Sequence, residues 1–98
     1  MIYLELDPWD KSTTRVQKKY LEYAVTGANA LEVFSEVVDG RSICSIIAEH
    51  ENEEYDVLIA GVPYADMQNL VSRKGYVKVE EKAVENKKLY QRFTRGNT

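Results

Sequence analysis

The residues that could carry metal chemistry gather around the single histidine, His50, in an acidic stretch of the chain. Glu51 follows His50 as in the helical zinc motif of metalloproteases, but the fifth position of that motif holds Glu54 and not a second histidine. The neighbouring carboxylates lack the glycine and the alternating Asp and Asn residues of a calcium loop. We therefore predict no metal site and no cofactor.

Nucleophilic catalysis needs a base beside its nucleophile, and His50 is the only histidine that could act as that base. Cys44, the only cysteine, precedes it by six residues, which span about 20 Å along an extended strand. A pair between these two side chains is therefore not expected, and Cys44 is predicted to be a small buried apolar residue. The glycines are isolated and form no phosphate-binding loop. Together these patterns predict a protein that is not an enzyme.

Nucleic-acid binding is an alternative, because basic and aromatic residues are interleaved near residue 90. On a helix, Lys88, Arg92 and Arg95 would lie in one stripe at spacings of four and three residues. Cationic side chains neutralise phosphates, and aromatic rings stack on unpaired bases. The overall pI of about 5.2 weighs against a dedicated nucleic-acid binder. The residues of this hypothesis are Lys87, Lys88, Tyr90, Arg92 and Arg95.

The net charge of −3 conceals two segments of opposite sign. Residues 49–66 contain six acidic residues and no Lys or Arg, whereas residues 67–98 contain eight basic and three acidic residues. This asymmetry can orient a charged partner, or bring the basic segment of one copy to the acidic segment of another. The alternative is that these charged side chains are only solvated at the surface and bind no partner, which would give the same sequence pattern. Seven tyrosines against two phenylalanines favour interface-like positions, and hence binding over catalysis.

Length and composition are those of a small globular protein. The 98 residues suffice for one domain, and the 44% hydrophobic and 30% charged residues are ordinary globular usage. The longest apolar run, residues 57–63, is far shorter than the roughly 20 residues that a membrane helix needs. No basic residue opens the chain as in a signal peptide. We expect a cytoplasmic protein without membrane contact, with one domain over residues 1–94 and a frayed tail over 95–98.

The first two elements follow from apolar periodicity. Alternating apolar residues over 2–6 predict a strand, which ends before Pro8. A helix is expected to begin near Thr14, after a group of N-cap residues, and to end at Gly27. The side chains expected on its apolar face are Val16, Tyr20, Tyr23 and Ala24.

A meander of three strands is expected next. Asp39-Gly40 favours a two-residue turn between strands over 30–38 and 42–48. These strands are rich in Val, Ile and Phe, which suit extended backbone. A polar connection then leads to a third strand over 55–62.

The remaining elements complete a small α+β fold. Pro63 suits the first turn of a helix over 64–74. A short strand over 76–79 follows, and the composition of 82–93 favours a last helix. The predicted order is β-α-β-β-β-α-β followed by this C-terminal helix. The expected architecture is an antiparallel meander sheet with its helices mainly on one face.

Apolar residues point to both faces of the predicted meander, and two helices cover only one face of a small sheet. A second copy of the chain is expected on the other face, because large apolar patches rarely stay exposed on monomers. Cover by the C-terminal segment is the alternative. The main hypothesis is a non-enzymatic protein–protein interaction or regulatory module, homodimeric through this face, that also binds another protein. The predicted partner-binding residues are Phe34, Val38, Ile46 and Leu58, with Trp9 as a further aromatic anchor.

Overall fold

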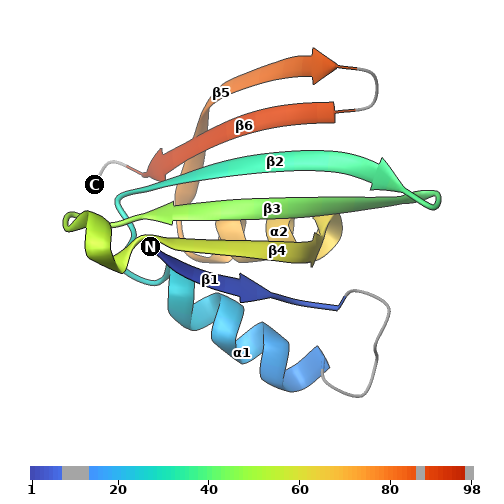
Figure 1. Cartoon of the computed structure of the whole chain (residues 1–98). Helices are drawn as coiled ribbons and strands as arrows, with labels where there is room; N and C mark the ends of the chain where they lie inside the picture. The colour runs from blue at the N-terminus through green and yellow to red at the C-terminus, as the bar shows by residue number, and fades with distance from the viewer. Residues whose placement is uncertain (8–13, 86–87, 97–98) are drawn as a thin grey trace.

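Six strands form one mixed sheet in the order β1-β4-β3-β2-β6-β5, and two helices lie on one side of it (Figure 1). The computed structural model describes residues 1–7, 14–85 and 88–96, and for residues 14–18 only the backbone. This is the α+β class that the sequence predicts. The elements are β1 (Ile2–Glu5), α1 (Thr14–Val25), β2 (Ala30–Val38), β3 (Arg41–Glu49), the 3-10 turn η1 (Glu53–Tyr55), β4 (Val57–Pro63), α2 (Tyr64–Arg73), β5 (Tyr76–Glu85) and β6 (Lys88–Arg95).

Strands β2 and β3 form the hairpin predicted at Asp39-Gly40, with Val38 opposite Arg41. Asp39 has a φ of 49° and Gly40 a φ of 76°, the positive values that a two-residue type I′ turn requires. Strand β4 runs antiparallel to β3 and completes the predicted meander. Strand β1 joins β4 in parallel, so the sheet is mixed rather than wholly antiparallel.

A bulge at Gly61 changes which side chains of β4 face the helices. Cys44 lies opposite Val62 and Ile46 opposite Ile59, so β4 carries one extra residue between these two pairs. Gly61 has a φ of 78°, a conformation that glycine adopts without strain. The extra residue lets Ile59 and Val62 both enter the core. The apolar alternation of this segment is impure for that reason.

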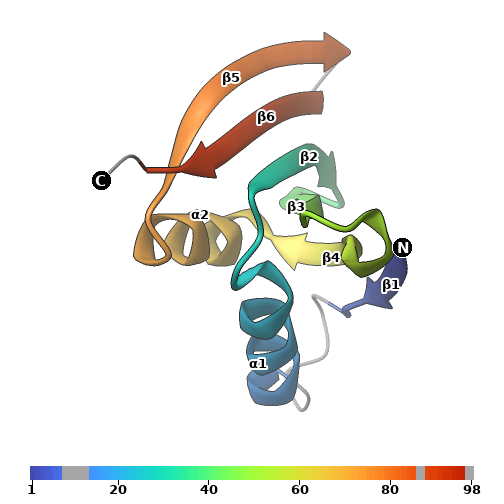
Figure 2. The same ribbon diagram turned by 90° about the vertical axis from the view of Figure 1, so that its left-hand side faces the viewer.

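The helix predicted over 82–93 is wrong, because this segment belongs to two paired strands, β5 and β6. Strand β6 inserts between β2 and β5, with Phe93 opposite Leu31. Pairing with two neighbours outweighs the helix propensity of the local Lys, Glu and Ala residues. Gln91 and Phe93 are buried two residues apart, which is the period of a strand. Figure 2 shows the resulting hairpin leaning away from α2.

The core lies between the sheet and the two helices. Helix α1 turns Leu21 and Val25 into it, whereas Tyr20 and Tyr23, expected on the apolar face of this helix, are exposed. Burial thus follows the aliphatic side chains, and the tyrosines remain at the surface. The other buried apolar residues of the core are Ala28, Leu31, Val33, Cys44, Ile46, Ala48, Val57, Ile59, Val62, Met67, Leu70, Val71, Tyr76 and Phe93.

Tyr76, at the start of β5, joins the C-terminal hairpin to the end of α1. Its buried hydroxyl lies 2.8 Å from the carbonyl oxygen of Val25 and 2.7 Å from that of Ala28. Arg95 Nε donates to the same Ala28 oxygen at 2.9 Å. The backbone N–H of Gly96 donates to the carbonyl just before β5 at 2.8 Å. The described part of the predicted tail is therefore hydrogen-bonded to the fold, and residues 97–98 lie outside the described residues.

Candidate functional site: the open face of the sheet

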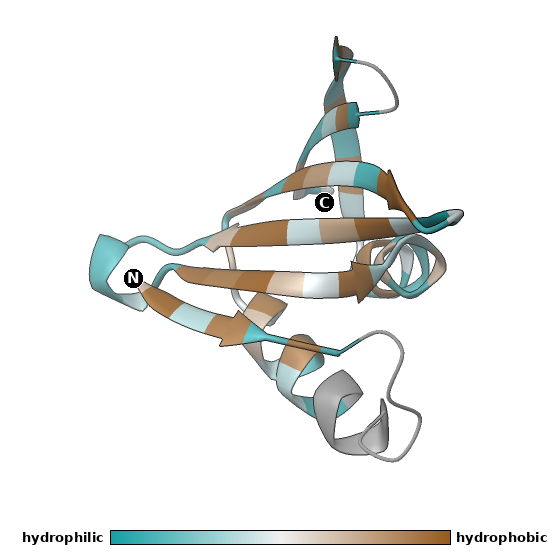
Figure 3. Cartoon of the chain, turned by 45° about the vertical axis from the view of Figure 1, so that its right-hand side comes forward, coloured by the Kyte–Doolittle hydropathy of each residue, from teal (hydrophilic) through white to brown (hydrophobic). Residues whose placement is uncertain are grey.

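The side of the sheet opposite the helices, here called the open face, carries a group of apolar side chains from neighbouring strands. Figure 1 looks onto this side, with α2 behind the sheet. Apolar segments run along β1, β4, β3 and β2, as Figure 3 shows. In the part of the chain that the structure describes, no helix or loop covers this group. Its large members on the four middle strands are Phe34, Val38, Ile43, Ile47, Leu58 and Tyr90, and Tyr3 on β1 lies beside Leu58.

An aromatic pair lies near the centre of the open face. Phe34 on β2 faces Tyr90 on β6, with ring centroids 5.1 Å apart and ring planes at 55°. The side chain of Phe34 is still 43% exposed. Lys82 Nζ lies 5.3 Å from the centre of the Tyr90 ring, a cation–π contact at the edge of the pair. Much apolar ring surface thus remains available for a partner.

Ile46 does not lie on the open face, so the prediction that placed it beside Phe34 is wrong. It is fully buried among the core residues, on the same side of β3 as Cys44. The two-residue turn sets Phe34 opposite Ser45, so Ile43 and Ile47 share the face of Phe34. The register implied by Asp39-Gly40 therefore contained the signal that would have placed these two isoleucines correctly. Phe34, Val38 and Leu58 do lie on the open face, and Trp9 lies outside the described residues.

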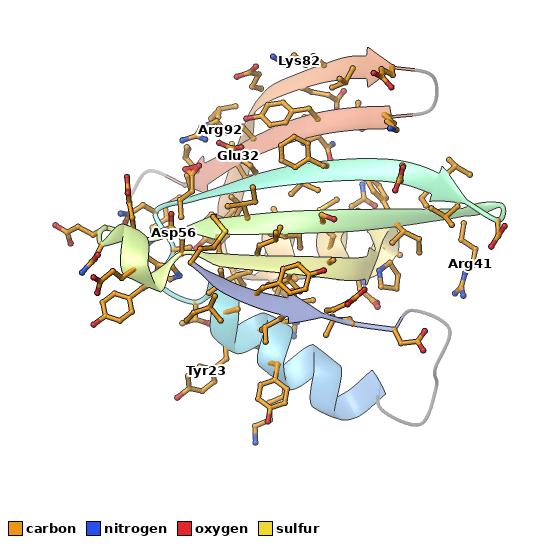
Figure 4. All side chains as sticks on the ribbon, viewed as in Figure 1. Tyr23, Glu32, Arg41, Asp56, Lys82 and Arg92 are labelled. Carbon is orange, nitrogen blue, oxygen red and sulfur yellow. The ribbon has the colours of Figure 1, made fainter. Side chains whose placement is uncertain are left out.

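A cluster of three charges lies at one end of the open face, where β6, β2 and β3 are neighbours (Figure 4). Arg92 Nη1 lies 2.9 Å from a carboxylate oxygen of Glu32 and 3.1 Å from one of Glu49. Arg92 Nη2 donates to the second Glu49 oxygen at 3.3 Å. The hydrogen bonds to Glu49 raise the pKa of Arg92. Burial and the adjacent Glu49 raise the pKa of Glu32, although Arg92 opposes this shift.

The basic residues of the nucleic-acid hypothesis do not form one stripe. Strand geometry places Lys88, Tyr90 and Arg92 on the open face, whereas Arg95 is on the other side of β6 and bonds to Ala28. The charge of Arg92 is met by two carboxylates, and Lys88 Nζ lies 3.7 Å from Glu85. Lys87 is outside the described residues.

Cys44 and His50, for which no catalytic pairing is predicted, each contact other residues. Cys44 is buried, its Sγ lies 3.2 Å from Ser35 Oγ, and burial raises the pKa of its thiol. His50 Nε2 lies 3.2 Å from the Ala24 carbonyl oxygen, at the end of α1. Among the described residues, no three His, Cys, Asp or Glu side chains gather so as to hold a metal ion. Neither helix, over the described ranges, has the length and apolar character needed to cross a bilayer.

Comparisons with protein-family models, curated proteins and solved structures found no match to this chain. Over the described residues, the open face is a group of neighbouring apolar side chains that neither helix covers. Its aromatic centre and charged end are features of binding surfaces.

The charged cluster predicts how stability depends on pH. Because the pKa of Glu32 is raised in the folded state, its stabilising contribution is present below the unfolded pKa and is lost as the pH rises through the folded pKa. Glu32→Gln removes this contribution but keeps an acceptor for Arg92. We expect a free energy of unfolding within about 0.5 kcal/mol of the parent at pH 7. Below the folded pKa the variant should become the less stable of the two, as measured by urea unfolding at several pH values.

Glu36→Gln is the matched control, since Glu36 is on the same face of β2 but opposite Lys88 and away from the cluster. It removes a carboxylate from the same face of β2 without removing an acceptor of Arg92. Parallel curves for Glu32→Gln and the parent would contradict the raised pKa.

Proposed function

We propose that this chain is a non-enzymatic protein-interaction module that forms a homodimer by packing the open faces of two copies together. The observation that carries the proposal is the group of six large apolar side chains on neighbouring strands, opposite the helices. Apolar patches larger than a few hundred Å² are rare on the surfaces of monomers. In a dimer with two-fold symmetry, the same patch on each copy packs against that patch on the other copy.

Charge at the margin of the open face would set the orientation of the two copies. Arg92 and Glu32 lie at one end, while Glu36 on β2 and Lys88 on β6 lie opposite each other in the ladder further along. The face therefore combines apolar and aromatic side chains with charges at one end and with Glu36 between Phe34 and Val38, and stable interfaces contain both kinds of group. Opposite charges at the margin favour one relative orientation, and like charges disfavour the others.

Phe34→Asp is the direct test of the homodimer. The parent protein is expected to have twice the chain mass of 11.3 kDa in light scattering at micromolar concentration. The variant should have the mass of one chain, because a carboxylate at the centre of an apolar interface is desolvated without a partner. It should keep the circular dichroism spectrum of the parent, because Phe34 is already 43% exposed.

Tyr23→Asp is the matched control. It also places a carboxylate at an exposed aromatic position, but on α1 and away from the open face. This variant should remain dimeric. A monomeric parent, or a Phe34→Asp variant that stays dimeric, would contradict the proposal.

A further inference from the structure

A second apolar surface lies at the β1 edge of the sheet, on the side of the helices. It is a groove of about 800 Å³ between β1, α1 and the turn around η1. Ile2 and Leu4 line it from β1, and three tyrosines line it from the other two elements. These are Tyr20 and Tyr23 on α1 and Tyr55 on η1, each more than half exposed. We refer to this surface as the tyrosine groove.

The tyrosine groove is separate from the open face. Ile2 and Leu4 lie opposite Val57 and Ile59 in the parallel ladder, and the latter two are core residues on the helix side of the sheet. Figure 4 shows Tyr23 projecting from α1 below β1. Side chains of a partner that enter this groove would therefore not contact Phe34.

The backbone of β1 offers hydrogen-bonding groups beside the groove. The N–H of Ile2 donates to Asp56 O at 2.7 Å, and that of Leu6 to Ala60 O at 2.9 Å, so the even-numbered amides face β4. Strand alternation then turns the N–H and C=O groups of Tyr3 and Glu5 to the outer edge. In the described residues, β1 is the end strand of the sheet on this side. Such an edge is a template for an added strand.

Charge differs between the two ends of the groove. The C-terminal end of α1 lies next to the acidic turn, because His50 Nε2 meets the Ala24 carbonyl oxygen at 3.2 Å. Exposed Glu51, Glu53 and Glu54 follow His50 in this turn. Lys19 lines the groove more than one helical turn before Ala24. One end is thus acidic, and the other end carries a cation.

We propose that the tyrosine groove binds an extended segment of another protein as an additional strand beside β1. Main-chain bonds to Tyr3 and Glu5 would supply affinity, and alternate apolar or aromatic side chains of the segment would enter the groove between Ile2, Leu4 and the tyrosines. A Lys or Arg at one end of the segment would face the acidic turn. This interaction goes beyond the proposed homodimer and does not depend on it, because it uses the outer edge of β1 and the groove on the helix side of the sheet.

The test uses a phage-displayed library of random ten-residue peptides, selected on the 98-residue chain. Enriched peptides are expected to alternate apolar and polar residues and to carry a basic residue at one end. A fluorescent copy of the best peptide should bind Tyr23→Asp at least about tenfold more weakly than the parent in anisotropy titrations. Phe34→Asp, on the open face, should bind it as the parent does, so the failure of one proposal is distinguishable from failure of the other.

Backbone methylation of the same peptide tests strand addition itself. Methyl groups on the amides that face β1 should abolish binding, because they remove the donors, whereas methyl groups on the alternate amides should leave most of it. Absence of enrichment, or equal binding to the parent and Tyr23→Asp, would overturn the proposal. So would conversion of a dimeric parent to monomers by Tyr23→Asp, since the groove would then hold a second copy.

Discussion

Ile46→Asp is expected to leave the chain largely unfolded at pH 7. Ile46 is fully buried on the helix side of β3, among Val33, Ile59 and the other core residues. A carboxylate there would have neither water nor a partner, which costs several kcal/mol. A domain of this size has a total stability of about 5–15 kcal/mol, and so the substitution removes most or all of it. Circular dichroism and urea unfolding measure the result.

Ile47→Asp is the control from the neighbouring position, since Ile47 is half-buried on the open face. It should fold, with a smaller loss of stability. The pair of variants tests the register of β3, because a shift by one residue would exchange the two outcomes. If Ile46→Asp unfolded at the same urea concentration as the parent, this register of β3 would be contradicted.

Tyr76→Phe is expected to lower the free energy of unfolding by about 1–3 kcal/mol, because it removes the donor for buried backbone carbonyls. The hydroxyl lies within 2.8 Å of the oxygens of Val25 and Ala28. Arg95 still donates to Ala28, so the Val25 oxygen loses most. Urea unfolding gives the change directly. A thermal midpoint lower by about 4–8 °C for each kcal/mol should accompany it.

Tyr55→Phe is the matched control, because Tyr55 is 62% exposed on the surface of η1. Its stability should stay within about 0.5 kcal/mol of the parent. An equally small effect of Tyr76→Phe would show that this hydroxyl does not hold the C-terminal hairpin to α1.

Local sequence signals were sufficient to predict an element wherever residues close in the chain determine its backbone conformation. Asp39-Gly40 predicted the β2–β3 turn because both residues accept positive φ values. Pro63 predicted the start of α2 because proline suits the first turn of a helix. Phe34, Val38 and Leu58 were predicted on the face opposite the helices, and they lie there.

The features that the sequence did not predict depend on contacts between segments far apart in the chain. Strand β6 exists because β2 and β5 lie on either side of it, and β2 is more than 50 residues earlier in the chain. The parallel pairing of Ile2 with Val57 is of the same kind. Ile46 was placed on the wrong face because the register of β3 follows from the turn and not from hydrophobicity alone. The bonds between Tyr76 and the end of α1 likewise join segments about 50 residues apart.

The interior position of β6 has a consequence for biosynthesis. The meander of β2, β3 and β4 is built from consecutive strands and can pair as soon as residue 63 has left the ribosome. Strand β5 is synthesised before β6 but reaches the sheet only through it. The edge of β2 that pairs with β6 therefore stays unpaired until the segment up to Arg95 has left the ribosome. Assembly of this half of the sheet is thus expected after translation of β6 rather than stepwise during synthesis.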